Sequence, residues 1–134
     1  MVTPLRPTVL IVDDDTKFLT FLSRTLKRGG FHVLTACDGS EVEDLLAANR
    51  VDVLLLDLQM PGVNGWEVIR QLRREPVGAG IGAKPPARPK VLVLSGRNED
   101  ETSTFVRRLG ADAFLSKPPW GDQLLATVRG LLAS

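Results

Sequence analysis

Residues 51–57 read Val51-Asp52-Val53-Leu54-Leu55-Leu56-Asp57, an apolar run that ends in a carboxylate. A short apolar run of this kind is typical of a strand that is covered on both faces. A carboxylate is costly inside a core, so Asp57 is expected at the edge of a sheet, where its strand ends. This position makes Asp57 the first candidate functional residue.

Three further apolar runs also end in polar or charged residues. Residues 9–12 are followed by Asp13-Asp14-Asp15, residues 90–94 by Ser95-Gly96, and residues 112–116 by Lys117-Pro118-Pro119. Because the carboxyl ends of parallel strands meet at one edge of a sheet, the acids, the hydroxyl and the lysine are expected to converge there. Such a set suits a divalent cation and a phosphoryl group.

The apolar runs alternate with segments of helical period, which predicts a repeated βα unit, a parallel sheet and the α/β class. Strands are expected over residues 8–13, 32–36, 51–57, 90–95 and 112–116. Helices are expected over residues 16–28, 41–49, 65–74, 98–109 and 120–132. Gly29-Gly30 should end the first helix. Ser40 should cap the second, with Glu43 at the capping-box position.

Residues 75–90 interrupt the alternation because they are rich in glycine and proline. Neither a regular helix nor a strand is expected throughout such a segment. A long surface loop is therefore predicted before the fourth strand.

The chain of 134 residues fits one domain, with a core over about residues 8–132. A formal net charge of +1 gives no reason to propose binding to nucleic acid or to a membrane. The one cysteine, Cys37, excludes an internal disulfide, and the cytoplasm is the expected compartment. Cys37 is expected to be a small buried hydrophobe, and His32 a surface or hydrogen-bonded histidine.

The acids, the hydroxyl and the lysine suit phosphoryl transfer to a side chain. A carboxylate oxygen of Asp57 can attack an activated phosphoryl group and form an acyl phosphate. Asp13 and Asp14 are hard oxygen ligands of the kind that Mg²⁺ takes, Lys117 supplies positive charge, and Ser95 a hydroxyl donor. Two carboxylates about 4 Å apart repel by roughly 4 kcal/mol at an effective dielectric of about 20, so a cation is expected.

Each motif also has a purely structural interpretation. Asp13-Asp14-Asp15 is compatible with a solvated turn that caps the next helix, Asp57 with a turn before Pro61-Gly62, and Lys117 with a solvated lysine. Their joint occurrence at successive strand ends favours the functional interpretation.

These residues give the chain a strong resemblance to the receiver domain of two-component response regulators, over about residues 8–132. The motifs that carry it are Ile11-Val12-Asp13-Asp14-Asp15, residues 55–65 from Leu55-Leu56-Asp57 to Asn64-Gly65, Leu94-Ser95-Gly96, and residues 110–118 from Gly110-Ala111-Asp112 to Ser116-Lys117-Pro118. The resemblance implies one receiver domain over residues 1–134. It also implies a flavodoxin-like five-stranded parallel sheet in the order 2-1-3-4-5, with helices on both faces.

By resemblance, Asp57 accepts a phosphoryl group from the phosphohistidine of a histidine kinase or a phosphotransfer protein. Asp13 and Asp14 form the acid pocket. Asp14, Asp57 and the backbone carbonyl of Gln59 ligate Mg²⁺. Ser95 and Lys117 bind the phosphoryl oxygens.

The resemblance also implies how the signal leaves the domain. Phe114 matches the aromatic switch position that works with Ser95, and Pro118 matches the proline that follows the lysine through a cis bond. Three features depart from the usual pattern. The loop at 75–90 is long, Phe114 lacks the hydroxyl of a tyrosine, and Gln59 and Arg97 occupy the positions that flank the attacking water. The expected output is binding of an unidentified downstream protein through the face at residues 98–132, by a monomer or a weak phosphorylation-dependent dimer.

Two competing functions fit the sequence less well. An aspartate-nucleophile phosphatase of the haloacid-dehalogenase type usually carries a second aspartate two residues after the nucleophile, where this chain has Gln59, so it would lack its proton donor. A receiver-like module that binds without phosphorylation fits poorly with the intact acids, Ser95 and Lys117. The expected function is thus a signalling switch that catalyses only its own phosphorylation and dephosphorylation. The domain is expected to be either a stand-alone regulator or part of a longer protein. No output domain is expected in this chain.

Overall fold

The computed structural model of the chain describes residues 6–57, 89–95, 110–116 and 121–133. The elements in these ranges are β1 (Thr8–Val12), α1 (Thr16–Arg28), β2 (His32–Ala36), the 3₁₀ turn η1 (Gly39–Glu41), α2 (Val42–Ala48), β3 (Val53–Asp57), β4 (Lys90–Ser95), β5 (Ala113–Ser116) and α5 (Gly121–Ala133). The helices expected at 65–74 and 98–109, and almost all of the loop expected at 75–90, lie outside the described residues.

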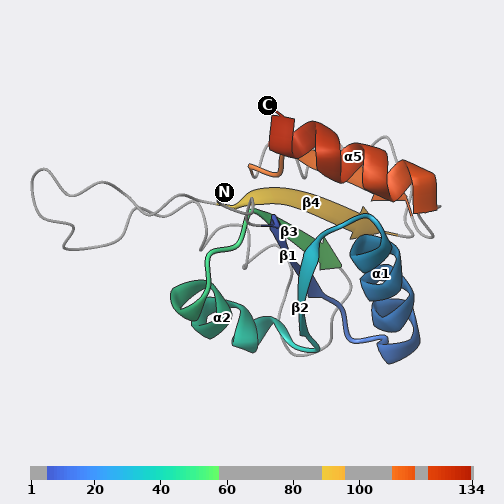
Figure 1. Cartoon of the computed structure of the whole chain (residues 1–134). Coiled ribbons are helices and arrows are strands. Elements are labelled where there is room, and N and C mark those ends of the chain that lie inside the picture. Colours follow the sequence, from blue (N-terminus) through green and yellow to red (C-terminus); the bar gives the residue numbers. More distant parts are fainter. Residues whose placement is uncertain (1–5, 58–88, 96–109, 117–120, 134) are drawn as a thin grey trace, which may run out of the picture.

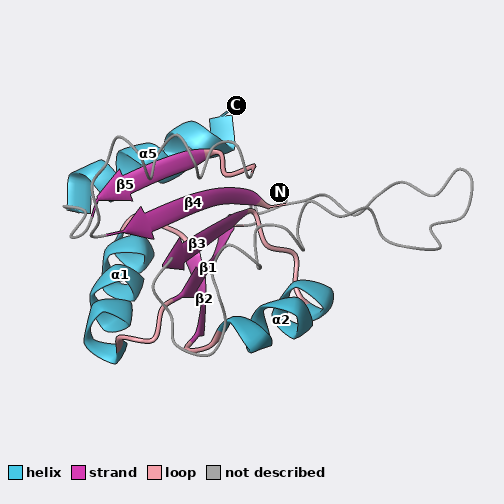
Figure 2. Ribbon diagram, turned by 180° about the vertical axis from the view of Figure 1, so that it is seen from behind, coloured by secondary structure: helices cyan, strands magenta, loops and turns pink. Residues whose placement is uncertain are grey.

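The five strands form one parallel sheet in the order β2-β1-β3-β4-β5 (Figure 2). This flavodoxin-like order is the one expected from the sequence. The interior strand β1 pairs through Val9 with Val33 of β2 and with Val53 of β3. Because β1, β3 and β4 have a neighbour on each side and a layer on each face, almost every side chain in them is apolar and buried.

Two cores flank the sheet, and Figure 1 shows the helices that cover them. The α1/α5-side core is formed where α1 and α5 pack on one face, through Leu19, Leu22, Leu26, Leu124, Val128 and Leu131. The α2-side core lies on the opposite face, where Val42 of α2 packs against side chains of β1, β3 and β4. Each strand therefore supplies alternate residues to the two cores. Among the described helices, none is long and apolar enough to cross a membrane.

The first helix shows how local sequence sets the boundaries of an element. The Asp15 carboxylate accepts hydrogen bonds from the backbone N–H groups of Lys17 at 3.0 Å and Phe18 at 3.2 Å, which caps α1 at its start. At its end, Gly30 adopts a φ of 92° and donates its N–H to the carbonyl of Lys27 at 3.1 Å. A left-handed glycine just past the helix is the usual stop, as the sequence predicted.

Two sequence predictions were wrong. Ser40 does not cap a helix beginning at 41, because a 3₁₀ turn precedes α2 and the Asp38 carboxylate caps that turn by accepting the Ser40 N–H at 2.9 Å. Cys37 is exposed rather than buried. It lies just beyond the end of β2, which is an edge strand of the sheet. His32 is exposed, as expected.

The strands β3 and β5 begin slightly later than predicted because an aspartate precedes each of them. Asp52 accepts the Thr8 N–H on Oδ2 at 2.8 Å and donates its own N–H to the Thr8 carbonyl at 2.9 Å. Asp112 repeats the arrangement with Val91, at 2.7 Å and 2.9 Å. Each carboxylate thus satisfies a partly buried backbone donor at the amino end of the neighbouring strand.

Two glycine-to-alanine substitutions should shift the free energy of unfolding in opposite directions. Gly30→Ala forces a Cβ into the left-handed region and should cost about 1–2 kcal/mol. Gly130 lies inside α5, where an added Cβ would meet no described atom within 4 Å. Gly130→Ala should therefore gain about 0.4–1 kcal/mol. Urea unfolding of both variants measures the difference, and a stabilised Gly30→Ala would contradict the assigned backbone conformation.

Candidate functional site

Polar side chains end three neighbouring strands at the carboxyl edge of the sheet. Asp57 is the last residue of β3 and Ser95 the last of β4, while Asp13 follows β1 directly. The Asp13 N–H donates to the Ala36 carbonyl at 3.1 Å, which continues the β1–β2 ladder by one residue. Asp13, Asp57 and Ser95 are 1%, 3% and 0% exposed, so their polar groups are held almost entirely away from bulk water.

The alternation of side chains in β1 and β3 explains why Asp13 and Asp57 meet. Ile11 and Leu55 both belong to the α1/α5-side core and are register partners in the sheet. Asp13 and Asp57 each follow two residues after Ile11 and Leu55. Because side chains alternate along a strand, the side chains of Asp13 and Asp57 lie on the same face of the sheet on neighbouring strands.

Three carboxylates gather at this edge. Asp13, Asp14 and Asp57 each offer an oxygen, and these oxygens all lie within 4.8 Å of one another. Asp14 is exposed and the other two are buried. Among the described residues, no other histidine, cysteine or acidic side chain joins the cluster.

The third aspartate of the run has a different role. Asp15 caps α1 with its carboxylate, and its N–H donates to Asp13 Oδ1 at 3.0 Å. The helix-capping interpretation of Asp13-Asp14-Asp15 therefore holds for Asp15. The turn that Asp13 and Asp15 form also fixes the side chain of Asp13 at the edge of the sheet.

The donor set fits a hard divalent cation. Carboxylate oxygens are the ligands that Mg²⁺ and Ca²⁺ prefer, and Mg²⁺ keeps several of its waters. The cluster gives such an ion one exposed carboxylate beside two buried ones, so it is reachable from solvent on the Asp14 side. Positive charge here offsets the mutual repulsion of the acids, which weakens only slowly with distance in a desolvated site.

Ser95 and Phe114 lie near one another in the strand register. Phe114 pairs with Val93, and Ser95 with Ser116, across the β4–β5 ladder. Phe114 is half-buried and packs against the α2-side core, to which Val93 also belongs. Ser95, two residues after Val93, is on the same face of the sheet.

Three of the residues expected at the site, Gln59, Lys117 and Pro118, lie outside the described residues. In the sequence, Lys117 comes directly after Ser116, the residue that ends β5. Three expectations therefore stay predictions. They are the role of Lys117, the role of the Gln59 carbonyl, and the cis bond before Pro118.

Comparison with known proteins decides the family. A model of the response regulator receiver domain matches residues 9–129. This chain belongs to that family. The receiver domain is a signalling domain of two-component systems, and response regulators receive phosphoryl groups from histidine kinases.

Similar proteins agree with the assignment. The receiver domain is 40% identical over 124 residues to the response regulator MprA of Mycobacterium tuberculosis (strain ATCC 25618 / H37Rv), an alignment that covers 92% of this chain and 50% of that protein. MprA of Mycobacterium avium (strain 104) is 39% identical over the same length. The chain thus spans about half the length of these curated relatives.

Solved structures show the same fold. The Vibrio cholerae chemotaxis protein CheY4 superposes with a TM-score of 0.80 at 28% identity, covering 96% of this chain and 100% of that one. The Francisella response regulator 1452 receiver domain gives a TM-score of 0.79 at 29% identity, covering 96% and 98%. Five parallel strands in this order are therefore the framework that carries the acid cluster.

Substitution of neighbouring aspartates should separate ligation from capping. Asp14→Asn removes a charged oxygen from the cluster and should weaken Mg²⁺ binding about tenfold or more, a factor that corresponds to about 1.4 kcal/mol. Asp15→Asn is the matched control, because asparagine caps a helix as well as aspartate does and Asp15 is not a member of the cluster. Calorimetric titration with MgCl₂ measures both, and equal losses would contradict the placement of Asp14.

Proposed function

We propose that this receiver domain is a phosphorylation-dependent switch in which Asp57 accepts a phosphoryl group from a phosphohistidine. The donor would be a histidine kinase or a phosphotransfer protein. The observation that carries the proposal is the buried carboxylate of Asp57, at the end of β3, with oxygens of Asp13 and Asp14 within 4.8 Å. Three carboxylate oxygens this close repel one another, and a bound cation would offset that repulsion.

The transfer is a displacement at phosphorus. A carboxylate oxygen of Asp57 attacks, the bond from phosphorus to the donor's imidazole nitrogen breaks, and its electron pair stays on that nitrogen. Asp13, Asp14, Asp57 and the Gln59 carbonyl would hold Mg²⁺, which when bound supplies positive charge against the crowded oxygens. Ser95 and Lys117 would donate to the phosphoryl oxygens, as positioned donors do in phosphoryl transfer.

Burial of Asp57 bears on this chemistry. Asp57 is 3% exposed, so its charge is poorly solvated and depends on nearby groups of opposite sign. Fixed donors and a cation then act more strongly than they would in water.

The proposed output passes from Ser95 to Phe114. Both lie on the same face of β4 and β5, and Phe114 is only half-buried. If the Ser95 hydroxyl turns towards a phosphoryl oxygen, it leaves space beside the sheet that the Phe114 ring can enter. The ring has no hydroxyl, so packing alone sets the balance, and a difference of a few kcal/mol between the two states suffices.

The partner surface is proposed to be the face at residues 98–132, of which β5 and most of α5 are described. Its occupant would be a downstream protein or, weakly, a second phosphorylated copy. We place the domain in the cytoplasm. We expect no direct binding to nucleic acid or to a membrane, since the formal net charge is only +1.

The phosphoacceptor can be tested directly. Incubation with acetyl phosphate and Mg²⁺ should add one phosphoryl group to the wild type and none to Asp57→Asn, because the amide is a far poorer nucleophile than the carboxylate. Intact mass spectrometry gives the readout. Asp15→Asn serves as control and should be modified like the wild type. An unmodified wild type, or equal modification of Asp57→Asn, would refute the assignment.

The coupling has its own test. Ser95→Ala should still be phosphorylated, but amide chemical shifts over β5 and α5 should change much less on addition of beryllofluoride than they do in the wild type. Thr20→Ala is the control, since its hydroxyl bonds only the Thr16 carbonyl on the exposed side of α1. Full wild-type shifts in Ser95→Ala would rule out the path through Phe114.

A further inference from the structure

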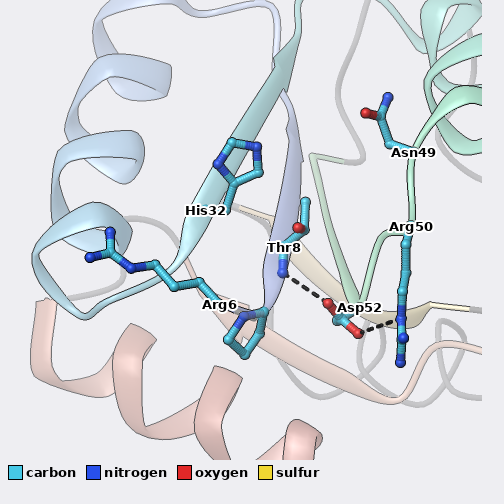
Figure 3. Close-up of a pocket in the computed structure, with 7 residues that line it drawn as sticks. Arg6, Thr8, His32, Asn49, Arg50 and Asp52 are labelled. Carbon is cyan, nitrogen blue, oxygen red and sulfur yellow. Dashed lines mark hydrogen bonds and ion pairs between the residues drawn. The ribbon is translucent and has the colours of Figure 1, made fainter. Parts of the chain in front are cut away.

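The amino edge of the sheet carries a pocket of about 360 Å³ (Figure 3). It lies at the opposite end of the strands from Asp13 and Asp57. The residues that line it and bear on its chemistry are Arg6, Thr8, His32, Asn49, Arg50 and Asp52. We refer to it as the amino-edge pocket. Its volume is at the low end of the range for small-molecule sites, about 300–1,000 Å³.

The floor of the amino-edge pocket is fixed by backbone pairing. Thr8 and Asp52 exchange two hydrogen bonds, at 2.8 Å and 2.9 Å. The His32 N–H donates to the Pro7 carbonyl at 3.0 Å. The starts of β1 and β2 and the approach to β3 are therefore tied together, so the positions from which the side chains project are set before any ligand arrives.

The side chains around this floor leave an excess of positive charge. In Figure 3, Arg50 lies beside Asp52, while Arg6 lies on the other side of Thr8 with its guanidinium directed outward. Asp52 is the acid among the lining residues, and both of its oxygens are engaged, Oδ2 by the Thr8 N–H and Oδ1 by Arg50 Nε at 3.7 Å. Two guanidinium groups against one carboxylate give the lining a charge of +1 with His32 neutral.

Most of the donors around the pocket remain available. The Arg50 side chain is 83% exposed and meets Asp52 at a long distance, through Nε, so its terminal nitrogens can bind elsewhere. Within the described part of the chain, Arg6 and His32 make no side-chain hydrogen bond or ion pair. The proposed function uses none of these residues.

We propose that the amino-edge pocket binds a small anion that carries phosphate or carboxylate groups. Arginine presents a planar fork of N–H donors that matches the oxygens of either group. Two arginines on opposite sides favour a ligand with more than one anionic group. Because Thr8 and Asp52 join the amino ends of β1 and β3, an anion bound there would stabilise the same strand pair that ends in Asp13 and Asp57.

Titration with pyrophosphate, in the absence of Mg²⁺ and at constant ionic strength, tests the proposal. The amides of Thr8, His32 and Asp52 should shift and saturate in ¹H–¹⁵N correlation spectra. Arg50→Gln and, separately, Arg6→Gln should each weaken the affinity about tenfold, since each loses a charge-assisted contact. Arg24→Gln, on the exposed side of α1, is the matched control and should bind like the wild type.

Two further arms identify the site and the ligand chemistry. Asp57→Asn should bind unchanged, which separates this pocket from the phosphoryl site. A parallel titration with citrate shows whether phosphate or carboxylate groups are preferred, and saturation by either supports the proposal. It is overturned if no saturable shift occurs up to about 10 mM of either anion, if Arg24→Gln weakens binding as much as Arg50→Gln, or if the shifts centre on Asp57 and vanish in Asp57→Asn.

Discussion

The parallel pairing of β1 with β3 is the constraint on which the acid site depends. Val12 pairs with Leu56, so the residues that follow, Asp13 and Asp57, leave the sheet at the same level and from the same face. The apolar side chains below them fill both cores. Moving either carboxylate into a core would therefore carry a large desolvation cost. The paired strands and the packed cores therefore hold the acids together at the edge of the sheet. Their electrostatic repulsion destabilises the fold, and positive charge at the site reduces it.

Much of this arrangement could be predicted because it follows from local patterns. Apolar runs that end in polar residues located the strand ends, and the family resemblance supplied the strand order. The errors arose where two local patterns competed. Asp38 and Ser40 are both good caps, and sequence alone did not show that a 3₁₀ turn would intervene and use Asp38. Whether Cys37 is buried depends on what packs beyond the end of an edge strand, and local sequence does not show that.

Three consecutive aspartates illustrate how backbone direction divides the work among identical side chains. Asp13 continues a strand and is buried, Asp14 lies in the turn and is exposed, and Asp15 starts a helix and caps it. All three side chains are chemically identical. Their burial and roles differ because the backbone changes from strand to helix across these three residues. The predicted roles of Asp13 and Asp14 at the metal thus rest on positions that Asp15 helps to set, since its N–H holds the Asp13 carboxylate.

The aspartates before β3 and β5 have a consequence for folding accuracy. In a parallel pair of nearly uniform apolar strands, a slip of two residues keeps every side chain on its proper face, so hydrophobic burial discriminates weakly against it. Asp52 and Asp112 bind the backbone donors of Thr8 and Val91 in one alignment alone. In any slipped alignment these hydrogen bonds are lost, and the partly buried N–H donors are left unsatisfied at a free-energy cost. Asp52 and Asp112 therefore fix the register of the strands from the amino edge of the sheet, opposite the edge that carries the acid cluster.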